Sequence, residues 1–282
     1  MASSQELKSI SAKRDNQQFE LLTIIDHAVG NTMSTVVPAL NCSLRSNVLP
    51  ADIFELVYHA ELSARELQGK ISALTALFEK PDACTSVRLS SYNIEQFFTA
   101  ITEQLNQTLG DMYKGRITFR FTDNYTQNAV FDARRISMIL YHLVSNSIQH
   151  GKTNNKNVKI TCKSKSNHFE LIVRDFGGGV PDEVLPKLFN KYDDNFSLDR
   201  QFIGLLPPRL TGLGLPLCDK LVNDMNGKII FKNYETGAKF TIIIPQNKNR
   251  LYESTIFVPD DSLLMECMAT LLLHLNERKE KV

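Results

Sequence analysis

Apolar residues recur at helical spacing through the first third of the chain. Between Glu6 and about Leu44 they fall every three or four positions, which places them on one stripe of a helix. The members of this stripe are Leu21, Ile25, Ala28, Thr32 and Val36. A second run alternates spacings of four and three, as a heptad seam does. Its members are Ile53, Val57, Ala60, Ala64, Leu67, Ile71, Leu74 and Phe78. The pattern predicts two long amphipathic helices.

The break between these helices is short and polar. It runs from Arg45 to Pro50, and two helices joined by so short a loop form an antiparallel hairpin. Two helices alone bury little core, so the apolar seam predicts a second hairpin and hence a homodimeric four-helix bundle. The alternative is a hairpin that packs on the second domain of its own chain. We expect the hairpin to occupy residues 1–82.

The pattern changes after a linker at Pro81–Ser91. Helices and strands are then mixed without regular βαβ alternation, which favours an α+β fold with helices on one face of a mixed sheet. The predicted helices are Ile94–Leu109, Ala133–His150 and Pro216–Met225. The predicted strands are Arg116–Phe121, Val158–Lys163, Phe169–Asp175, Lys228–Lys232 and Lys239–Ile244. The expected fold class is therefore α+β: an antiparallel helical hairpin followed by an α/β sandwich.

Composition narrows the classes of protein that fit. The 282 residues suffice for about two domains. A net charge of +1 gives no field of one sign, so we expect no nucleic-acid partner. No run approaches the roughly 18 apolar residues of a membrane helix, and the polar residues 1–18 do not resemble a signal peptide. The five cysteines are far apart and form no zinc pattern, so a cytoplasmic location is expected.

Three segments have the chemistry of a nucleotide site. In the first, a strand ends in Asp175 and three glycines follow it. Glycines permit positive φ and close approach of a ligand to the backbone, and a buried carboxylate can accept a hydrogen bond from an amino group such as that of adenine. Taken alone, this segment is equally consistent with an ordinary turn.

The second segment is Thr211-Gly-Leu-Gly-Leu215, directly before a helical run. Glycines that open a helix leave backbone N–H groups free beside the positive end of its dipole, which favours an anion such as phosphate. The spacing is that of neither a P-loop nor a dinucleotide-binding motif.

The third segment is the helix Leu140–Gly151, where Asn146 and His150 lie four residues apart and away from the apolar face. The amide oxygen of Asn146 is a suitable ligand for Mg²⁺.

Together these segments resemble the catalytic domain of the histidine kinases within the GHKL ATPase superfamily, over about Val87–Gln246. The resemblance implies ATP and Mg²⁺ as cofactors, recognition of adenine by Asp175, a metal contact at Asn146 and a lid at about Asn190–Leu210. The residues expected to contact the nucleotide are Asn146, His150, Asp175, Gly177, Gly179, Lys191, Thr211, Gly212, Leu213, Gly214 and Leu215.

The family pattern also concerns residues before and within the lid. Apolar residues before the lid resemble a family box: Val184, Leu185, Leu188 and Phe189. Candidate phosphate partners in the lid are Lys191, Arg200 and Arg209. Two positions depart from the pattern, because His142 stands where the family commonly has a further asparagine and Leu210 where it often has glycine.

The family also places a phosphoacceptor histidine on the first helix of a preceding hairpin. His27 lies off the apolar stripe, and His27 with Asn31 resembles the H-x-x-x-N pattern of the family. His27 is the expected phosphoacceptor, and Asn31 is expected to orient a water for dephosphorylation. The departure is Ala28, since many of these kinases have an acid there as a general base. Asp26 precedes His27, but it lies about 100° around the helix on the opposite side from Ala28, so we do not expect it to replace that acid.

The last segment, residues 251–282, resembles the opening of a receiver domain. Thr255–Ser262 reads as an apolar strand that ends in paired acids, and a helical run from Leu263 to Leu275 follows. Such a tail suggests either a piece of a hybrid kinase or a remnant, because it is too short for a receiver, and it is expected to be poorly ordered or docked as a helix. The alternative is an ordinary C-terminal helix with an acidic cap.

The leading hypothesis from the sequence is an ATP-dependent protein histidine kinase of a two-component phosphorelay, which phosphorylates His27 and passes the phosphoryl group to a receiver aspartate. The expected partners are a second copy of the chain and the receiver domain of a response regulator. The expected location is the cytoplasm, including the cytoplasmic part of a membrane-bound sensor. The alternative is a degenerate ATP-binding homologue that acts as a phosphotransfer, phosphatase or scaffold partner.

Overall fold

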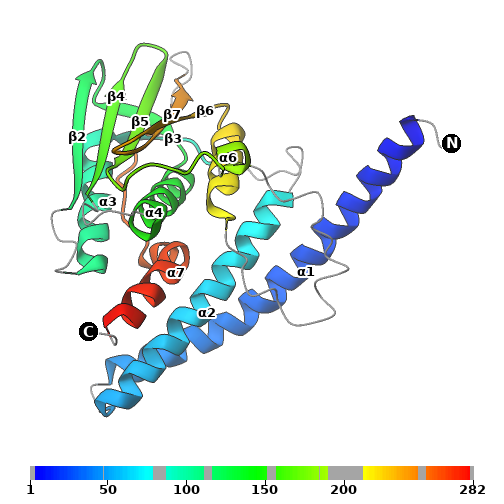
Figure 1. The fold of residues 1–282 in the computed structure, drawn as a ribbon, viewed down its shortest axis with the longest axis vertical. Helices are drawn as coiled ribbons and strands as arrows, with labels where there is room; N and C mark the ends of the chain where they lie inside the picture. Colours follow the sequence, from blue (N-terminus) through cyan, green and yellow to red (C-terminus); the bar gives the residue numbers. More distant parts are fainter. Residues whose placement is uncertain are drawn as a thin grey trace. The chain divides into compact units, whose positions relative to one another are not determined.

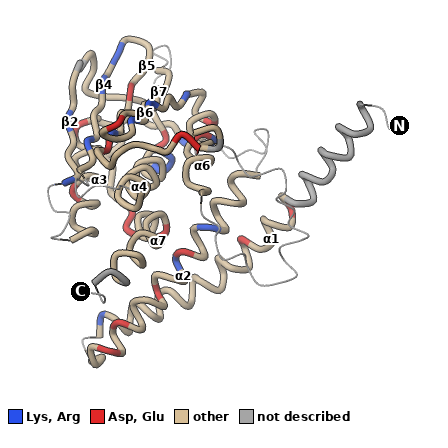
Figure 2. Tube along the Cα trace, in the orientation of Figure 1, with Lys and Arg blue, Asp and Glu red and all other residues tan. Residues whose placement is uncertain are grey.

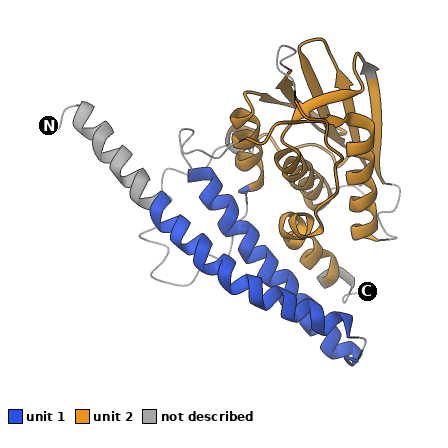
Figure 3. Ribbon diagram, turned by 180° about the vertical axis from the view of Figure 1, so that it is seen from behind, with its two compact units in different colours: residues 1–84, 190–213 blue, residues 85–189, 214–282 orange. Residues whose placement is uncertain are grey.

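The computed structural model describes residues 4–46, 48–78, 87–110, 116–150, 157–183, 185–189, 212–246 and 252–279. The chain divides into two units, coloured separately in Figure 3. The first comprises residues 1–84 and 190–213, and the second comprises residues 85–189 and 214–282. Figure 2 shows acidic and basic residues interspersed along the described parts of both units. In those parts, no helix combines the length and the apolar character needed to cross a bilayer.

The first unit contains the predicted helical hairpin. Helix α1 spans Ser4–Arg45 and helix α2 spans Ala51–Phe78, and the two run side by side (Figure 1). Leu22 and Val37 of α1 are buried, and Thr75 Oγ1 donates a hydrogen bond to the carbonyl oxygen of Leu22 at 3.4 Å. The loop between the helices is short, as the polar break predicted.

The stripe predicted for the first helix is not the face that packs on α2. Leu21 is 48% exposed and Val36 is 37% exposed, whereas the residues that follow each of them are buried. The first half of the α2 seam is likewise exposed to solvent, since Ile53 is 40% exposed. The second half is buried at Ile71 and Leu74. Because leucine and isoleucine side chains gain free energy on burial, these exposed positions mark an apolar surface that the single hairpin does not cover.

A mixed five-stranded sheet forms the core of the second unit, in the order β2-β4-β5-β7-β6. Strands β2 and β4 are parallel, and the other neighbouring pairs are antiparallel. The strands span Ile117–Asn124 (β2), Val158–Ser164 (β4), His168–Asp175 (β5), Lys228–Tyr234 (β6) and Gly237–Pro245 (β7). Helices α3, α4 and α6 lie on one side of this sheet (Figure 1). They span Ile94–Leu109, Ala133–His150 and Gly214–Asp224. The α+β class and the one-sided helix layer are confirmed.

A small second sheet was not predicted. It pairs β1 (Ser90–Asn93) with β3 (Asn128–Phe131) in antiparallel fashion. Tyr92 and Phe131 stack at 5.1 Å between ring centroids, and Phe97 of α3 meets Phe131 edge-on at 4.8 Å. Aromatic pairs of this kind contribute about 0.5–1.5 kcal/mol beyond the area that they bury, so they stabilise the small sheet. A 3-10 turn, Leu185–Lys187, lies within the predicted apolar box.

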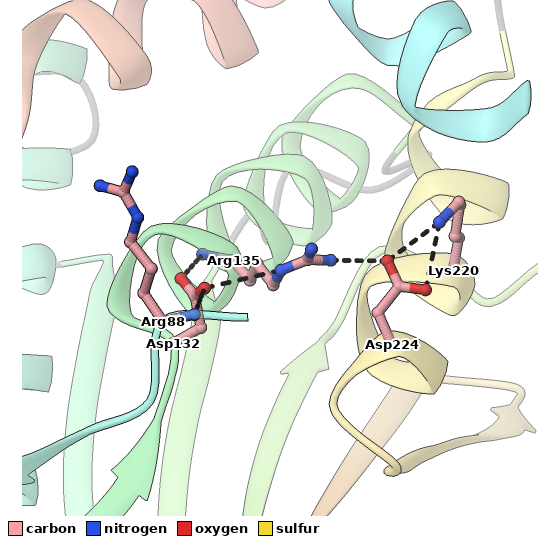
Figure 4. Close-up of polar contacts among 5 residues, drawn as sticks. All are labelled: Arg88, Asp132, Arg135, Lys220 and Asp224. Carbon is pink, nitrogen blue, oxygen red and sulfur yellow. Dashed lines mark hydrogen bonds and ion pairs between the residues drawn. The ribbon is translucent and has the colours of Figure 1, made fainter. Parts of the chain in front are cut away.

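An ion-pair network fastens α4 to α6 (Figure 4). Asp132 caps the N-terminus of α4, because its Oδ1 accepts the backbone N–H of Arg135 at 3.1 Å. The guanidinium of Arg135 donates to Asp224 Oδ2 at 2.6 Å, and Lys220 Nζ lies 2.9 Å from the same oxygen. The other carboxylate oxygen of Asp132 accepts the backbone N–H of Arg88 at 2.8 Å. The first turn of α4 is thus tied to the last turn of α6.

The C-terminal segment docks on the second unit as a helix. Helix α7 spans Asp261–Lys279 and packs against α4, and Gln104 Nε2 donates to Asp261 Oδ1 at 2.8 Å. Asp260 caps α7 by accepting the backbone N–H of Ser262 at 2.9 Å. The strand predicted at Thr255–Ser262 is wrong, since only Ser254 forms a bridge, to Ser91. The segment is held by this single bridge and by the packing of Phe257 on Phe97, at 4.1 Å between ring centroids.

Candidate nucleotide site

Asp175 lies at the end of β5, and its carboxylate is oriented by the backbone. Its Oδ1 accepts the N–H of Gly177 and the N–H of Ala238, both at 3.0 Å. Two such bonds on one oxygen fix the position of Oδ1 without a cation. Among the described residues both bonds fall on Oδ1, so Oδ2 is the oxygen that remains for an amino group of a ligand.

The glycines after Asp175 permit a loop that other residues could not form. Gly178 has φ of 91° and Gly179 has φ of 71°, a region that disfavours residues with a Cβ. A Cβ at Gly179 would also meet Asn233 Oδ1 at 2.8 Å. The loop therefore lies directly against the turn between β6 and β7.

Asn233 is a residue of this site that the sequence did not indicate. Its Oδ1 accepts the N–H of Val180 at 2.9 Å, and its Nδ2 donates to the carbonyl oxygen of Val180 at 2.8 Å. An asparagine before a turn is common for local reasons. Nothing in the local pattern shows that this one pairs with a loop 53 residues away.

Helix α4 presents three polar side chains at one-turn intervals. His142 and Asn146 are half-buried and His150 is exposed, and their spacing of four places them on one face of the helix. Burial lowers the pKa of His142 to about 4, so its imidazole is neutral at physiological pH. A neutral ring can both donate and accept a hydrogen bond, as the asparagine common at this position can.

The second glycine segment meets α4 at His142. Gly214 is the first residue of α6, and a Cβ there would lie 3.4 Å from His142 Nδ1. The backbone N–H groups of the first turn of α6 thus open beside the polar face of α4. Gly212 has φ of 98°, Leu213 is buried and Leu215 is half-buried. The structure therefore brings the segment at Gly214 to the helix that carries Asn146.

The other predicted contacts with the nucleotide fall outside the described residues. These are Lys191 and Thr211. The lid at 190–210 also lies outside the described residues, with its cations Arg200 and Arg209, and so do Val184 of the apolar box and Leu210, which stands where the family often has glycine.

A magnesium ion fits the donors that are present. No group of three or more His, Cys, Asp or Glu residues in the described part of the chain could hold a metal by itself. Mg²⁺ commonly takes one or two protein oxygens and completes its shell with phosphate oxygens and water. The amide of Asn146, half-buried on α4, supplies an oxygen of the right type.

His27 is exposed on α1, in the first unit. Asn31, one turn further along, is exposed as well. The carboxylate before His27 is turned toward the second helix, because Asp26 Oδ1 accepts a hydrogen bond from Ser72 Oγ at 3.1 Å. The described neighbours of His27 along the helix therefore offer no carboxylate directed at its ring.

Comparison with known proteins supports the class that fold and site define. Residues 131–248 match the family described as histidine kinase-, DNA gyrase B- and HSP90-like ATPases. This range contains Asn146, Asp175, Asn233 and Gly214. Residues 131–248 accordingly match an ATP-binding domain of the GHKL type, and a helical hairpin precedes them in the chain.

The curated relatives are signal transduction histidine kinases. The chain is 30% identical over 144 residues to the signal transduction histidine-protein kinase BarA of Escherichia coli, covering 49% of this chain and 15% of BarA. It is 33% identical over 123 residues to the kinase AfsQ2 of Streptomyces coelicolor, covering 43% of this chain and 21% of AfsQ2. The match thus spans only a small part of either relative.

Two solved structures share the fold. Full-length ShkA, in complex with AMPPNP, has a TM-score of 0.56 at 18% identity, over 80% of this chain and 46% of that one. The histidine kinase ThkA, in complex with the response regulator TrrA, has a TM-score of 0.51 at 18% identity, over 89% of this chain and 70% of that one.

Proposed function

We propose that the chain is an ATP-dependent protein histidine kinase of a two-component phosphorelay, which phosphorylates His27 and passes the phosphoryl group to an aspartate of a receiver domain. The observation that carries this proposal is the combination of an exposed His27 on a hairpin with an ATPase domain in which Asp175 is oriented for a ligand. In this proposal residues 1–82 are the phosphoacceptor hairpin, 87–246 the catalytic domain and 251–282 a C-terminal segment that docks as a helix.

Each part of the site has a role in binding ATP. Oδ2 of Asp175 accepts the amino group of adenine, which distinguishes adenine from guanine because guanine has a carbonyl oxygen at that position. The N–H groups that open α6 at Gly214 bind phosphate oxygens beside the positive end of the helix dipole. His142 meets this segment at Gly214, and Asn146 follows His142 by one turn on the same face of α4. Mg²⁺ held at Asn146 would offset the negative charge of the phosphates.

Phosphoryl transfer then needs a nucleophile and a place for its proton. The unprotonated ring nitrogen of His27 uses its lone pair to form the new bond to the γ-phosphorus as the bond to the ADP oxygen breaks, and the proton on the other ring nitrogen passes to water. A neutral imidazole is a competent nucleophile. Catalysis of phosphoryl transfer depends mainly on positioning and charge stabilisation. The alanine at position 28, where many of these kinases have an acid, therefore lowers the rate without removing the reaction.

Two partners are part of the proposal. Apolar side chains exposed on the hairpin support a second copy of the chain as the cover of this surface. They are Leu21, Ile24, Val36, Ile53, Phe54 and Leu56. A response regulator is the proposed acceptor, because ThkA, which shares the fold, is seen in complex with one. The cytoplasm is the proposed location.

A degenerate homologue is the second candidate function. The observation that favours it is the environment of His27, where residue 28 is alanine and Asp26 is bonded to Ser72. Such a chain would bind ATP and dimerise, and it would act as a phosphotransfer, phosphatase or scaffold partner without labelling itself.

Labelling separates the two candidates. The purified chain and a His27→Ala variant are incubated with γ-labelled ATP and Mg²⁺, and acid-labile label on the protein is measured. We expect label on the parent and a loss of at least 100-fold in the variant, on the scale of removing a nucleophile (about 10²-fold or more). An unlabelled parent that still binds ATP would leave the degenerate homologue as the function. Equal label on both chains would assign the reaction to another residue.

A further inference from the structure

The loop that follows Asp175 is held from outside by a side chain. The amide of Asn233 makes both its bonds to one residue, accepting from the N–H of Val180 at 2.9 Å and donating to its carbonyl oxygen at 2.8 Å. This two-bond pattern resembles the pairing of neighbouring antiparallel strands, with a side chain in place of a backbone. Removing the amide leaves both backbone groups of Val180 without these partners.

Two glycines allow the loop and the turn to approach so closely. A Cβ at Gly179 would meet Asn233 Oδ1 at 2.8 Å, and a Cβ at Gly237 would meet the Cα of Phe176 at 2.8 Å. Contacts this short between heavy atoms are repulsive. The turn at 233–237 therefore lies against the loop along its length, and the loop cannot move toward it.

A cation between two rings joins the same elements a second time. The Arg174 guanidinium lies 5.0 Å from the ring centroid of Phe176 and 5.3 Å from that of Tyr234. A cation within about 6 Å of an aromatic face is attracted to it. Phe176 belongs to the loop and Tyr234 to the end of β6, so Arg174 draws the two together.

The same hairpin also orients the carboxylate. The N–H of Ala238, the second residue of β7, donates to Asp175 Oδ1 at 3.0 Å. One turn therefore fixes Asp175 through Ala238 and the far end of its loop through Asn233. We propose that Asn233 is a positioning residue for adenine recognition, which holds Val180 so that Oδ2 of Asp175 stays aimed at the amino group of the base. This inference rests on the nucleotide binding proposed above.

Base selectivity is the test. ATP and GTP are titrated by calorimetry into the full chain and into Asn233→Ala, with Asn223→Ala as the matched control. Asn223 is an exposed asparagine on α6 whose amide bonds only to Asp219, among the described residues, at 3.1 Å. We expect Asn233→Ala to weaken ATP about tenfold, the scale of lost hydrogen bonds, and GTP less than threefold. The control should bind both nucleotides as the parent does.

A conservative variant and a second measurement separate positioning from folding. Asn233→Asp keeps an acceptor for the N–H of Val180, so it should recover part of the ATP affinity. Hydrogen exchange at Val180 should be fast in the alanine variant and slower in the aspartate variant. If Asn233→Ala lost affinity for ATP and GTP by the same factor, the positioning role would be overturned while nucleotide binding would stand. A parent chain that binds neither nucleotide would overturn the nucleotide function itself, and the inference with it.

Discussion

At the scale of single residues, His142 shows how packing adapts an unusual side chain. It occupies a position where the family commonly has asparagine, it lies against Gly214, and burial lowers its pKa to about 4. An imidazole that is neutral at physiological pH keeps asparagine's capacity to donate and accept a hydrogen bond. At this position the departure in sequence therefore leaves a side chain that can form hydrogen bonds as asparagine does.

The lowered pKa of His142 predicts a pH-dependent stability. The unfolded chain binds a proton at this ring below about pH 6.5, whereas the folded chain does so only near pH 4. Within this window the unfolded state holds more protons, so stability rises with pH and falls on acidification, by at most about 1.4 kcal/mol per pH unit. Urea unfolding of the parent and of His142→Asn between pH 4 and 7.5 measures the slope.

In the asparagine variant this part of the slope should vanish. Parallel pH profiles for the two chains would show that His142 is protonated as easily in the folded state as in the unfolded one.

At the scale of elements, the ion-pair network between α4 and α6 predicts a large effect of one arginine. Arg135 lies between Asp132 and Asp224 with its side chain 12% exposed. Arg135→Ala leaves two largely buried carboxylates with fewer partners and should cost about 3 kcal/mol of unfolding free energy. The neighbouring Arg134 lies 3.8 Å from Asp260 with 64% of its side chain exposed, so Arg134→Ala should cost less than about 1 kcal/mol.

Urea denaturation of the three chains provides the comparison. Equal losses in the two variants would mean that burial does not distinguish the two arginines, and a loss below about 1 kcal/mol for Arg135→Ala would mean that the network contributes little.

The sequence predicted those elements whose signal is local. The limits of the helices Ile94–Leu109 and Ala133–His150 were predicted to the residue, because periodicity is strong and caps such as Asn93, which accepts the N–H of Gln96 at 3.0 Å, mark the ends. Strands β1 and β3 were missed because four residues each give too little alternation. Asn233 could not be found because its partner is remote in sequence.

At the scale of the whole molecule, the exposed apolar surface of the hairpin predicts dimerisation. Ile24 is 65% exposed and Leu56 is 67% exposed, and a partner hairpin would cover them. We expect the parent to sediment as a dimer and the double variant Ile24→Glu/Leu56→Glu as a monomer, because charges in an apolar interface are strongly unfavourable. Ile256→Glu, at a site 87% exposed in the second unit, serves as the control and should remain dimeric.

A parent that sediments as a monomer at all accessible concentrations would contradict this assembly. The hairpin would then need another cover for its apolar surface.

The network at Arg135 and Asp224 also gives α6 the mechanics of a lever. It anchors the last turn of the helix, while the glycine segment stands at the opposite end of its 11 residues, about 16 Å away at 1.5 Å per residue. If the last turn of α6 stays fixed, a tilt of the helix by about 4° moves the N–H groups at Gly214 by about 1 Å. A displacement of this size is enough to change the rate of a reaction that depends on exact placement of the reacting groups. Gating the reaction would then need only a small rotation of one helix.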